Sequence, residues 1–527
     1  MNIVLVGEPR ALTPWKESTT AGVFSIHETI TNGLIGSGAN SEPIPRLAVE
    51  VPSPDRGTWL IHPDGAMETT YRLQPNALWH DGTPVTAKDI AFSAQVQLDP
   101  RVEVNPIFAG TLRSHGVAGV DTPDDRTTII HWMKPFGFAD FLTFRDFSPL
   151  PAHLLQAVYE RDVEEFSRHP YWSDDSVFVG NGPYRLARWE QGVVMDLQAF
   201  DRYYLGKPQV DRMIITFVQD NNAAVARVMT GDYDMAWGAS FDRVTMDQVR
   251  GRGVGDFVIG SEGVNHLAFQ FKDVAQPIEL ARDIRLRRAM THATDRASIN
   301  EVDGEGISAV ADSWVHPSDP RYKDTEPFIT KYPYDPTRAL ALFTEAGWTR
   351  GPDGLLRSAE GQRFTCEIRG QMSKKSGEIT AAAWRTVGID AVAEPRPANL
   401  DRDLVARATY KCVEESFRGF GRNGVQHLHS EQAMIPERRY VGTNRGAYMN
   451  PELDRLIDGF FATQRTMDRL QADREIVRLI STDLPIMHTI YEIRKEFQHT
   501  GVAGLVIKTG LDPIRSSTWN VHEWNKQ

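Results

Sequence analysis

One short segment, residues 415–429, gathers side chains whose chemistry suits a charged or polar solute. Arg418 and Arg422 carry planar guanidinium groups, and Phe420 and Asn423 lie beside them in the sequence. Such guanidinium groups favour a carboxylate, a phosphate or several hydroxyls as partners. The alternative is that both arginines lie on a solvated loop. The segment is therefore a candidate ligand contact, and the alternative of a solvated loop remains open.

His427 and His429 are two residues apart, so both would face the same side of an extended segment. That spacing can supply two metal ligands, or can contact a metal that a chelator carries. No cysteine or carboxylate cluster completes a site nearby, although Glu431 is within reach. We favour a loop with two ordinary histidines, so no metal and no other cofactor is predicted.

Aromatic side chains are a further source of ligand contacts, because their rings cover apolar or sugar faces in binding clefts. Trp237 follows a predicted turn into a strand at residues 231–236, and Trp314 is a second candidate. For each of them, packing in the core is the alternative.

Catalytic motifs are missing from the sequence. It contains no H-E-x-x-H, no G-x-S-x-G and no G-x-x-x-x-G-K-[ST]. Acidic residues are abundant, yet no spacing marks a catalytic pair. A hydrolase is therefore the least supported class of function, and we expect a protein that performs no chemistry.

The elements that position these side chains alternate between strand-like and helix-like patterns, which predicts an α/β protein. Residues 70–76 alternate as a strand does, and Asp81-Gly82 predicts a tight turn. Thr86 then starts a helix, with Asp89 three residues on as the second half of a capping box.

Length and composition describe a large globular protein. A chain of 527 residues exceeds one ordinary core, so we expect at least two lobes. The formal net charge of −12 argues against a nucleic-acid partner. No apolar run approaches the ~18 residues of a membrane span.

Cys366 and Cys412 are the two cysteines. One bridge between them is possible, but buried free thiols are the interpretation we favour. The N-terminus lacks the basic and apolar regions of an export signal and runs directly into a predicted strand. Alone, that favours a cytoplasmic protein.

Six stretches resemble, in the correct order, the signature of family 5 extracellular solute-binding proteins, which are the peptide- and nickel-binding receptors of ABC importers. The first contains Trp79-His80-Asp81-Gly82-Thr83-Pro84, and the fifth is a Tyr334-Asp335-Pro336 helix that ends at Ala346-Gly347-Trp348. The stretches are residues 70–90, 180–208, 231–236, 283–296, 334–348 and 448–457.

The resemblance implies a two-lobe fold like that of periplasmic binding proteins (type II, cluster C-like), with an extra β-rich subdomain. Lobe I would comprise residues 1–45, the β-rich subdomain at 46–170, and residues 171–264. Lobe II would comprise residues 265–490, and residues 491–527 would return to lobe I. The resemblance also implies a mature domain whose export signal has been removed.

The resemblance places the ligand between the lobes. Peptide-binding members carry an aspartate near residues 415–429 for the peptide's α-ammonium group, whereas this chain has no Asp between Cys412 and Asn450. That departure argues against ordinary peptide specificity. The candidate ligand-binding residues are Thr20, Ala21, Trp237, Asn265, His266, Trp314, Arg418, Phe420, Arg422 and Asn423.

The sequence therefore predicts a solute receptor that closes two lobes around a small polar solute and delivers it to an ABC permease. Peptide-like, opine-like and oligosaccharide ligands remain open. A nickel or metallophore receptor on the same fold is the alternative, and a secreted hydrolase is a distant third. We expect a monomer in the periplasm or outside the cell, with or without a lipid anchor.

Overall fold

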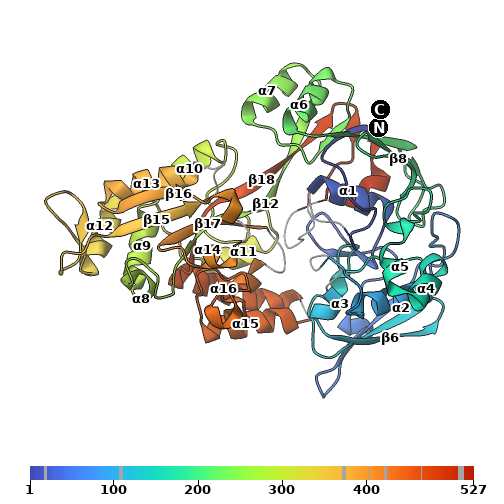
Figure 1. The fold of residues 1–527 in the computed structure, drawn as a ribbon, viewed down its shortest axis with the longest axis horizontal. Helices are drawn as coiled ribbons and strands as arrows, with labels where there is room; N and C mark the ends of the chain where they lie inside the picture. Colours follow the sequence, from blue (N-terminus) through green and yellow to red (C-terminus); the bar gives the residue numbers. More distant parts are fainter. Residues whose placement is uncertain are drawn as a thin grey trace. The chain divides into compact units, whose positions relative to one another are not determined.

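The computed structural model describes residues 1–16, 21–105, 111–370, 375–400, 403–419, 424–464, 466–508 and 516–526 (Figure 1). The chain divides into two compact units. Unit 1 comprises Met1–Gly260, Phe461–Gln464 and Lys495–Gln527, and unit 2 comprises Ser261–Phe460 and Arg465–Arg494. Both units combine helices with strands, as the patterning predicts.

Unit 1 contains two main sheets and the helices that cover them. Its elements are β1 (Asn2–Val6), α1 (Ala21–Ile30), β2 (Ile35–Ser37), β3 (Pro43–Pro45), β4 (Trp59–Ile61), β5 (Met67–Arg72), α2 (Ala87–Leu98), α3 (Thr111–Ser114), β6 (Val117–Asp124), β7 (Thr127–Trp132), α4 (Ala152–Arg161), α5 (Val163–Ser167), β8 (Tyr184–Glu190), β9 (Val194–Ala199), β10 (Arg212–Val218), α6 (Asn221–Thr230), β11 (Met235–Trp237), α7 (Arg243–Gly251), β19 (Val502–Ala503) and β20 (Asn525–Lys526).

The larger sheet of unit 1 is built around β1, which pairs in parallel with β10 on one side and β11 on the other. Ile3, Val4 and Leu5 are fully buried, as expected for a central strand covered on both faces. The order continues from β10 to β9 and β8. The core of the unit lies against this sheet and includes Trp237.

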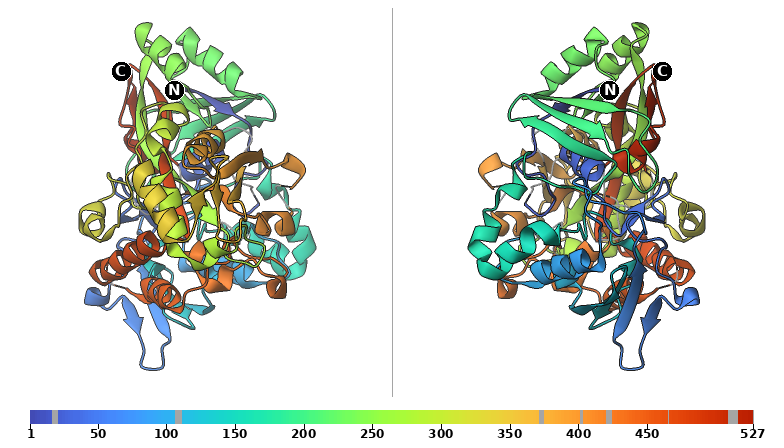
Figure 2. Two further views of the ribbon diagram at one scale, coloured as in Figure 1. Left: turned by 90° about the vertical axis from the view of Figure 1, so that its left-hand side faces the viewer. Right: turned by 90° about the vertical axis from the view of Figure 1, so that its right-hand side faces the viewer.

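The second sheet of unit 1 is antiparallel, with the strand order β4–β5–β7–β6. Figure 2 shows the β4–β5 hairpin extending from the rest of the unit. The turn at Gly82 has φ 93°, a conformation that favours glycine. The capping box at the start of α2 is confirmed, because the Asp89 carboxylate accepts a hydrogen bond from the Thr86 N–H at 2.8 Å.

Unit 2 is a second α/β body. Its elements are α8 (Glu279–Arg282), α9 (Ile284–His292), α10 (Arg296–Val302), α11 (Tyr322–Thr325), α12 (Pro336–Glu345), β13 (Thr349–Arg350), β14 (Leu356–Arg357), β15 (Thr365–Gly370), α13 (Ser376–Thr386), β16 (Asp390–Pro395), α14 (Leu404–Ala408), β17 (Val413–Gly419), α15 (Pro451–Ala462) and α16 (Thr466–Asp483).

Two long strands, β12 (Gly255–Phe269) and β18 (Ile486–His499), carry the chain between the units, and they are neighbours in the strand order. Within unit 2 the order is β16–β15–β17–β12–β18. The division between the units falls after Gly260 in β12 and after Arg494 in β18. The boundaries that the sequence suggests, at 264/265 and 490/491, lie within these same strands.

A disulfide joins Cys366 of β15 to Cys412, which precedes β17. The preference for free thiols was therefore wrong. β15 pairs in parallel with β17, with Ile368 opposite Val413, so Cys366 and the residue just before β17 lie side by side, and their Cα atoms are 5.2 Å apart. Both cysteines are also part of the buried core of unit 2.

Candidate functional site

Two adjoining small hollows of about 10 and about 20 Å³, each with room for little more than one water molecule, lie in unit 2, and we call them together the Arg418 pocket. Both are lined by His266, Arg418, His427, Leu428 and Ile486. The first hollow is further lined by Val264, Trp314, Gly419, Gly424, Val425, Ile480 and His488. The second is further lined by Ala268, Phe269, Ser416, Thr443, Asn444, Arg445, Gly446, Tyr448 and Pro485.

Strand pairing brings the polar members of the pocket together. β12 pairs antiparallel with β17, with His266 opposite Ser416 and Val264 opposite Arg418. Alternate residues of a strand share a face, so Ser416 and Arg418 lie on one side of β17. β18 runs beside β12 and supplies His488. Three strands distant in the sequence thus converge on one pocket.

Three buried imidazole rings form the centre of the pocket. The ring centroid of His266 lies 5.8 Å from that of His427 and 6.4 Å from that of His488. Burial lowers the pKa of His488 to about 3 and holds the pKa values of the other two well below their usual range. All three rings are therefore neutral at pH 7.

Each ring also keeps a nitrogen with no hydrogen-bond partner among the described residues. These atoms are Nδ1 of His266, Nε2 of His427 and Nε2 of His488. The other nitrogen of His427 bonds the Gly424 carbonyl, and the backbone of Asp312 bonds the His488 ring. Buried polar atoms are normally paired, so such orphans mark a place where a ligand or water can bind.

Arg418 is the principal charged group of the pocket. Its Nη2 donates to the Thr443 carbonyl at 3.0 Å, while its Nε is buried without a partner. Burial, together with the nearby Arg445 guanidinium, lowers the pKa of Arg418 to about 10, and the group stays charged at neutral pH. Within the described residues, no carboxylate forms an ion pair with Arg418.

Arg445 is the second guanidinium of the pocket. Its Nη1 lies 2.8 Å from Oε2 of Glu414, and Oε1 of the same fully buried carboxylate contacts Arg396. Lys272 donates to the Arg445 carbonyl, and burial lowers the pKa of this lysine to about 8. Glu414 therefore has both oxygens engaged, and the surroundings of the pocket are cationic.

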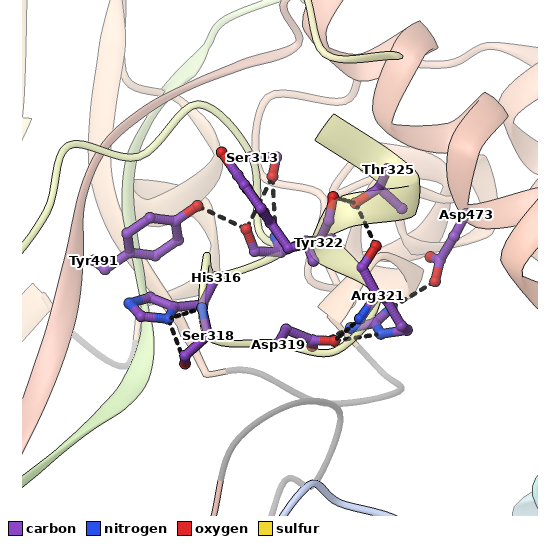
Figure 3. A network of polar contacts seen from close by, with 10 residues as sticks. Ser313, His316, Ser318, Asp319, Arg321, Tyr322, Thr325, Asp473 and Tyr491 are labelled. Carbon is purple, nitrogen blue, oxygen red and sulfur yellow. Dashed lines mark hydrogen bonds and ion pairs between the residues drawn. The ribbon is translucent and has the colours of Figure 1, made fainter. Parts of the chain in front are cut away.

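Trp314 lines the pocket. Figure 3 shows the polar network around Arg321 that holds the chain after Trp314 in place. The Arg321 guanidinium makes two bonds to Asp319, at 3.1 and 2.8 Å, and its third arm reaches Asp473 of α16. Tyr491 of β18 donates to the Val315 carbonyl at 2.7 Å. The loop on both sides of Trp314 is thus tied to α16 and β18.

The structure brings together four of the residues singled out in the sequence, namely His266, Trp314, Arg418 and His427. Asn265 is buried beside the pocket, and its Nδ2 donates to Glu492 at 2.6 Å. Trp237 belongs to unit 1, where it is fully buried in the core. Ala21 is the first residue of α1. Thr20, Phe420, Arg422 and Asn423 lie outside the described residues.

His427 and His429 do not share the face that an extended segment would give them. Residues Gln426–Leu428 form a 3-10 helix, η7, instead of an extended segment, so a spacing of two turns the rings apart. His429 accepts a hydrogen bond from the Glu431 N–H at 3.1 Å, and its other nitrogen lies 3.5 Å from Asp458. Only His427 lines the pocket.

Sequence reasoning missed His488 and Arg445. The alternation Ile486, His488, Ile490 is typical of one face of a strand and marks His488 as inward-facing. No local signal indicates that this strand lies beside β12. Arg445 lies in a segment without regular structure, and only its contact with Glu414 reveals its place.

Within the described residues, no group of three or more His, Cys, Asp or Glu side chains is arranged to hold a metal ion. None of the helices described there combines the length and hydrophobicity that a bilayer crossing requires.

Comparison with known proteins gives a consistent result. The family model of bacterial extracellular solute-binding proteins, family 5, matches residues 42–415. A Brucella ovis protein named as a candidate peptide-binding protein of an ABC transporter is 30% identical over 293 residues. That match covers 55% of this chain and 51% of the relative, so the chain aligns with about half of the relative's length.

Two further proteins resemble the chain over more of its length. The oligopeptide-binding protein AppA of Bacillus subtilis is 26% identical over 460 residues, which cover 81% of this chain and 76% of AppA. The crystal structure of NikA from Brucella suis in complex with Fe(III)-EDTA superposes with a TM-score of 0.77 at 16% identity, covering 100% of both chains. The structural likeness confirms the predicted two-lobe α/β fold.

Proposed function

Because the chain belongs to the bacterial extracellular solute-binding proteins, family 5, we propose that it is the solute receptor of an ABC importer. The observation that carries this proposal is the family match, which extends from residue 42 to residue 415. The receptor captures a small polar organic solute and presents it to the permease. Peptide-like, opine-like and oligosaccharide solutes are the candidate classes.

The Arg418 pocket supports binding rather than catalysis. It contains a charged guanidinium, three neutral imidazoles and an indole, with buried donors and acceptors that lack partners. Such convergent polar groups in a largely apolar pocket are typical of a ligand site. The imidazoles have pKa values far below neutrality, which makes them poor general bases at pH 7.

Transport requires that the permease distinguish the loaded receptor from the empty one. We place the bending in β12 and β18, the strands that pass between the units. A solute that contacts both units stabilises a closed state by its difference in affinity for the two states. The protein acts as a monomer outside the cytoplasm, by way of an export signal or a lipid anchor. The disulfide of unit 2 fits such an oxidising location.

Solute binding and turnover can be measured on the same samples. Peptides, opine-like conjugates and oligosaccharides are screened by thermal shift, since a ligand at 100 times its Kd adds about 2.7 kcal/mol of stability. We expect one class to stabilise the protein and to be recovered unchanged by mass spectrometry. Conversion of any stabilising solute would refute the receptor proposal and support an enzyme, and stabilisation by none would also count against it.

A receptor for a chelated metal is a second candidate, and the unpartnered ring nitrogens of the three histidines favour it. Neutral imidazole is a common ligand of nickel, copper and iron. In this case a chelator would supply most of the ligands, and one or two imidazoles would complete the coordination. Metal analysis of the protein loaded with nickel–histidine or ferric chelates tests the candidate. Stoichiometric metal that His427→Gln or His488→Gln removes supports it, and binding unaffected by both substitutions refutes it.

A further inference from the structure

We propose that the Arg418 pocket holds an oxyanion group of the imported solute, a carboxylate or a phosphate, with Arg418 as its cationic partner. This inference rests on the proposed receptor function and narrows its substrate class. Carboxylate and phosphate share the chemistry that a guanidinium recognises. The experiment below distinguishes them.

The charge of the pocket favours an anionic ligand group. Arg418 and Arg445 both line the second hollow, and Glu414 is the one described carboxylate that pairs with either of them. Glu414 is fully buried, and its two oxygens contact Arg445 and Arg396. The Glu414 carboxylate therefore pairs with Arg445 and Arg396 and not with Arg418. Arg418 is half-buried and has no carboxylate partner among the described residues, so an anionic ligand would supply the missing counter-charge.

The unpaired hydrogen-bond donors of the two arginines favour a ligand group that accepts hydrogen bonds. A guanidinium carries five N–H groups, and the Arg418 side chain makes one hydrogen bond among the described residues, to the Thr443 carbonyl. Its Nε is buried without a partner, as is that of Arg445. These unpaired guanidinium N–H groups favour a ligand group that is rich in acceptors.

One imidazole can add to the same preference. His266 and His427 line both hollows and keep Nδ1 and Nε2, respectively, without a partner. Because the neutral His427 ring donates from Nδ1 to the Gly424 carbonyl, its Nε2 is an acceptor. Nδ1 of His266 can carry the ring proton and donate to an oxyanion beside the guanidinium. A cationic ligand end, such as an ammonium group, would instead meet Arg418 and Arg445 and be repelled.

The test compares full-length wild type with Arg418→Met, which keeps the aliphatic stem and removes the charge. Arg338→Met is the matched control, because Arg338 is a half-exposed arginine of α12 in the same unit. Arg418→Lys keeps a positive charge but lacks the planar guanidinium with its paired N–H donors. The probes are inorganic phosphate, succinate and the uncharged succinamide, titrated at constant ionic strength with thermal shift and calorimetry as readouts.

Phosphate or succinate should stabilise wild type and Arg338→Met alike, while succinamide should not. Arg418→Met should weaken the binding by about tenfold or more, as loss of a charge-assisted hydrogen bond does, and Arg418→Lys should recover part of it. The stronger of the two anions identifies the oxyanion class. An equal response of wild type and Arg418→Met, including no response in either, overturns the proposal.

Circular dichroism and the melting temperature without probe show whether Arg418→Met is folded. If Arg418→Met is not folded, wild type and Arg418→Lys test the proposal instead, and equal binding of succinate and succinamide by wild type overturns the proposal.

Failure of the receptor function gives a different result. A neutral solute that binds one-to-one and is insensitive to Arg418→Met would leave the receptor intact and refute the oxyanion, whereas the absence of any bound solute would refute both.

Discussion

Replacing Arg321 by Met should destabilise unit 2 by about 3–5 kcal/mol, because it removes the cation from two buried carboxylates. The Asp319 and Asp473 side chains are 4% and 2% exposed, and Arg321 bonds both of them. Met preserves the volume of the stem but offers no donor. The Trp314 loop would also lose its link to α16.

The magnitude can be read from thermal unfolding of unit 2. For a body of about 230 residues, each kcal/mol shifts the melting temperature by about 2–4 °C, so the expected decrease is about 6–20 °C. Differential scanning calorimetry of the full-length protein, with hydrogen exchange to assign the transition to unit 2, measures it. Arg338→Met, which breaks an exposed pair with Glu345, is the control and should shift the transition by about 2 °C or less.

A pH series separates this cause from general loss of packing. Burial raises the pKa of Asp473, and Arg321 opposes that rise. Without Arg321 the carboxyl pKa rises further above that of the unfolded chain, so folding of the variant takes up protons and is favoured by acid. The difference in unfolding free energy between wild type and Arg321→Met should therefore become smaller as the pH falls from 7 to 5. A difference below 1 kcal/mol, or one that does not change with pH, would refute the reasoning.

Three further predictions concern other parts of the molecule. His27 is fully buried, and burial lowers its pKa to about 4, below the unfolded value of 6.5. The neutral form therefore contributes its full stability above pH 6.5, and this contribution is lost as the pH falls toward 4, at up to about 1.4 kcal/mol per pH unit. In urea unfolding, the stability of His27→Gln should fall less steeply with acid than that of wild type. An equally steep fall in both proteins would contradict this. Reduction of the Cys366–Cys412 bridge, whose cysteines are separated by 46 positions in the sequence, should lower the stability of unit 2 by about 2–4 kcal/mol. Calorimetry with and without reductant measures this loss, and an unshifted transition would show that the bridge does not stabilise the unit. Asp89→Ala leaves the Thr86 and Ala152 N–H groups without their acceptor, so the stability of unit 1 should fall by about 1–3 kcal/mol. Succinate binding by unit 2 should stay unchanged. Weaker succinate binding would contradict the independence of the pocket from the start of α2.

The sequence predicted local structure better than it predicted the pocket. The capping box of α2 and the Pro336 start of α12 depend on neighbouring residues, and both occur as expected. Arg418 and His266 were singled out for their chemistry, and the pairing of β12 with β17 places both on one pocket. His488 escaped notice because its proximity to them depends on contacts between distant segments.

The errors have the same origin. A common face for His427 and His429 would require an extended segment, and the 3-10 turn of η7 changes the periodicity. The disulfide could not be inferred from two cysteines 46 residues apart, because it requires β15 and β17 to be adjacent. Strand order is a property of the whole unit, and local propensity does not encode it.

The central claim is that this protein binds an oxyanion-bearing solute and does not transform it. Native mass spectrometry of the protein from its own host, purified without unfolding, tests that claim directly. The account predicts one small molecule per chain that carries a carboxylate or phosphate, is released intact on denaturation, and rebinds wild type but not Arg418→Met. A released molecule without an anionic group, or one that the protein converts on incubation, would contradict it.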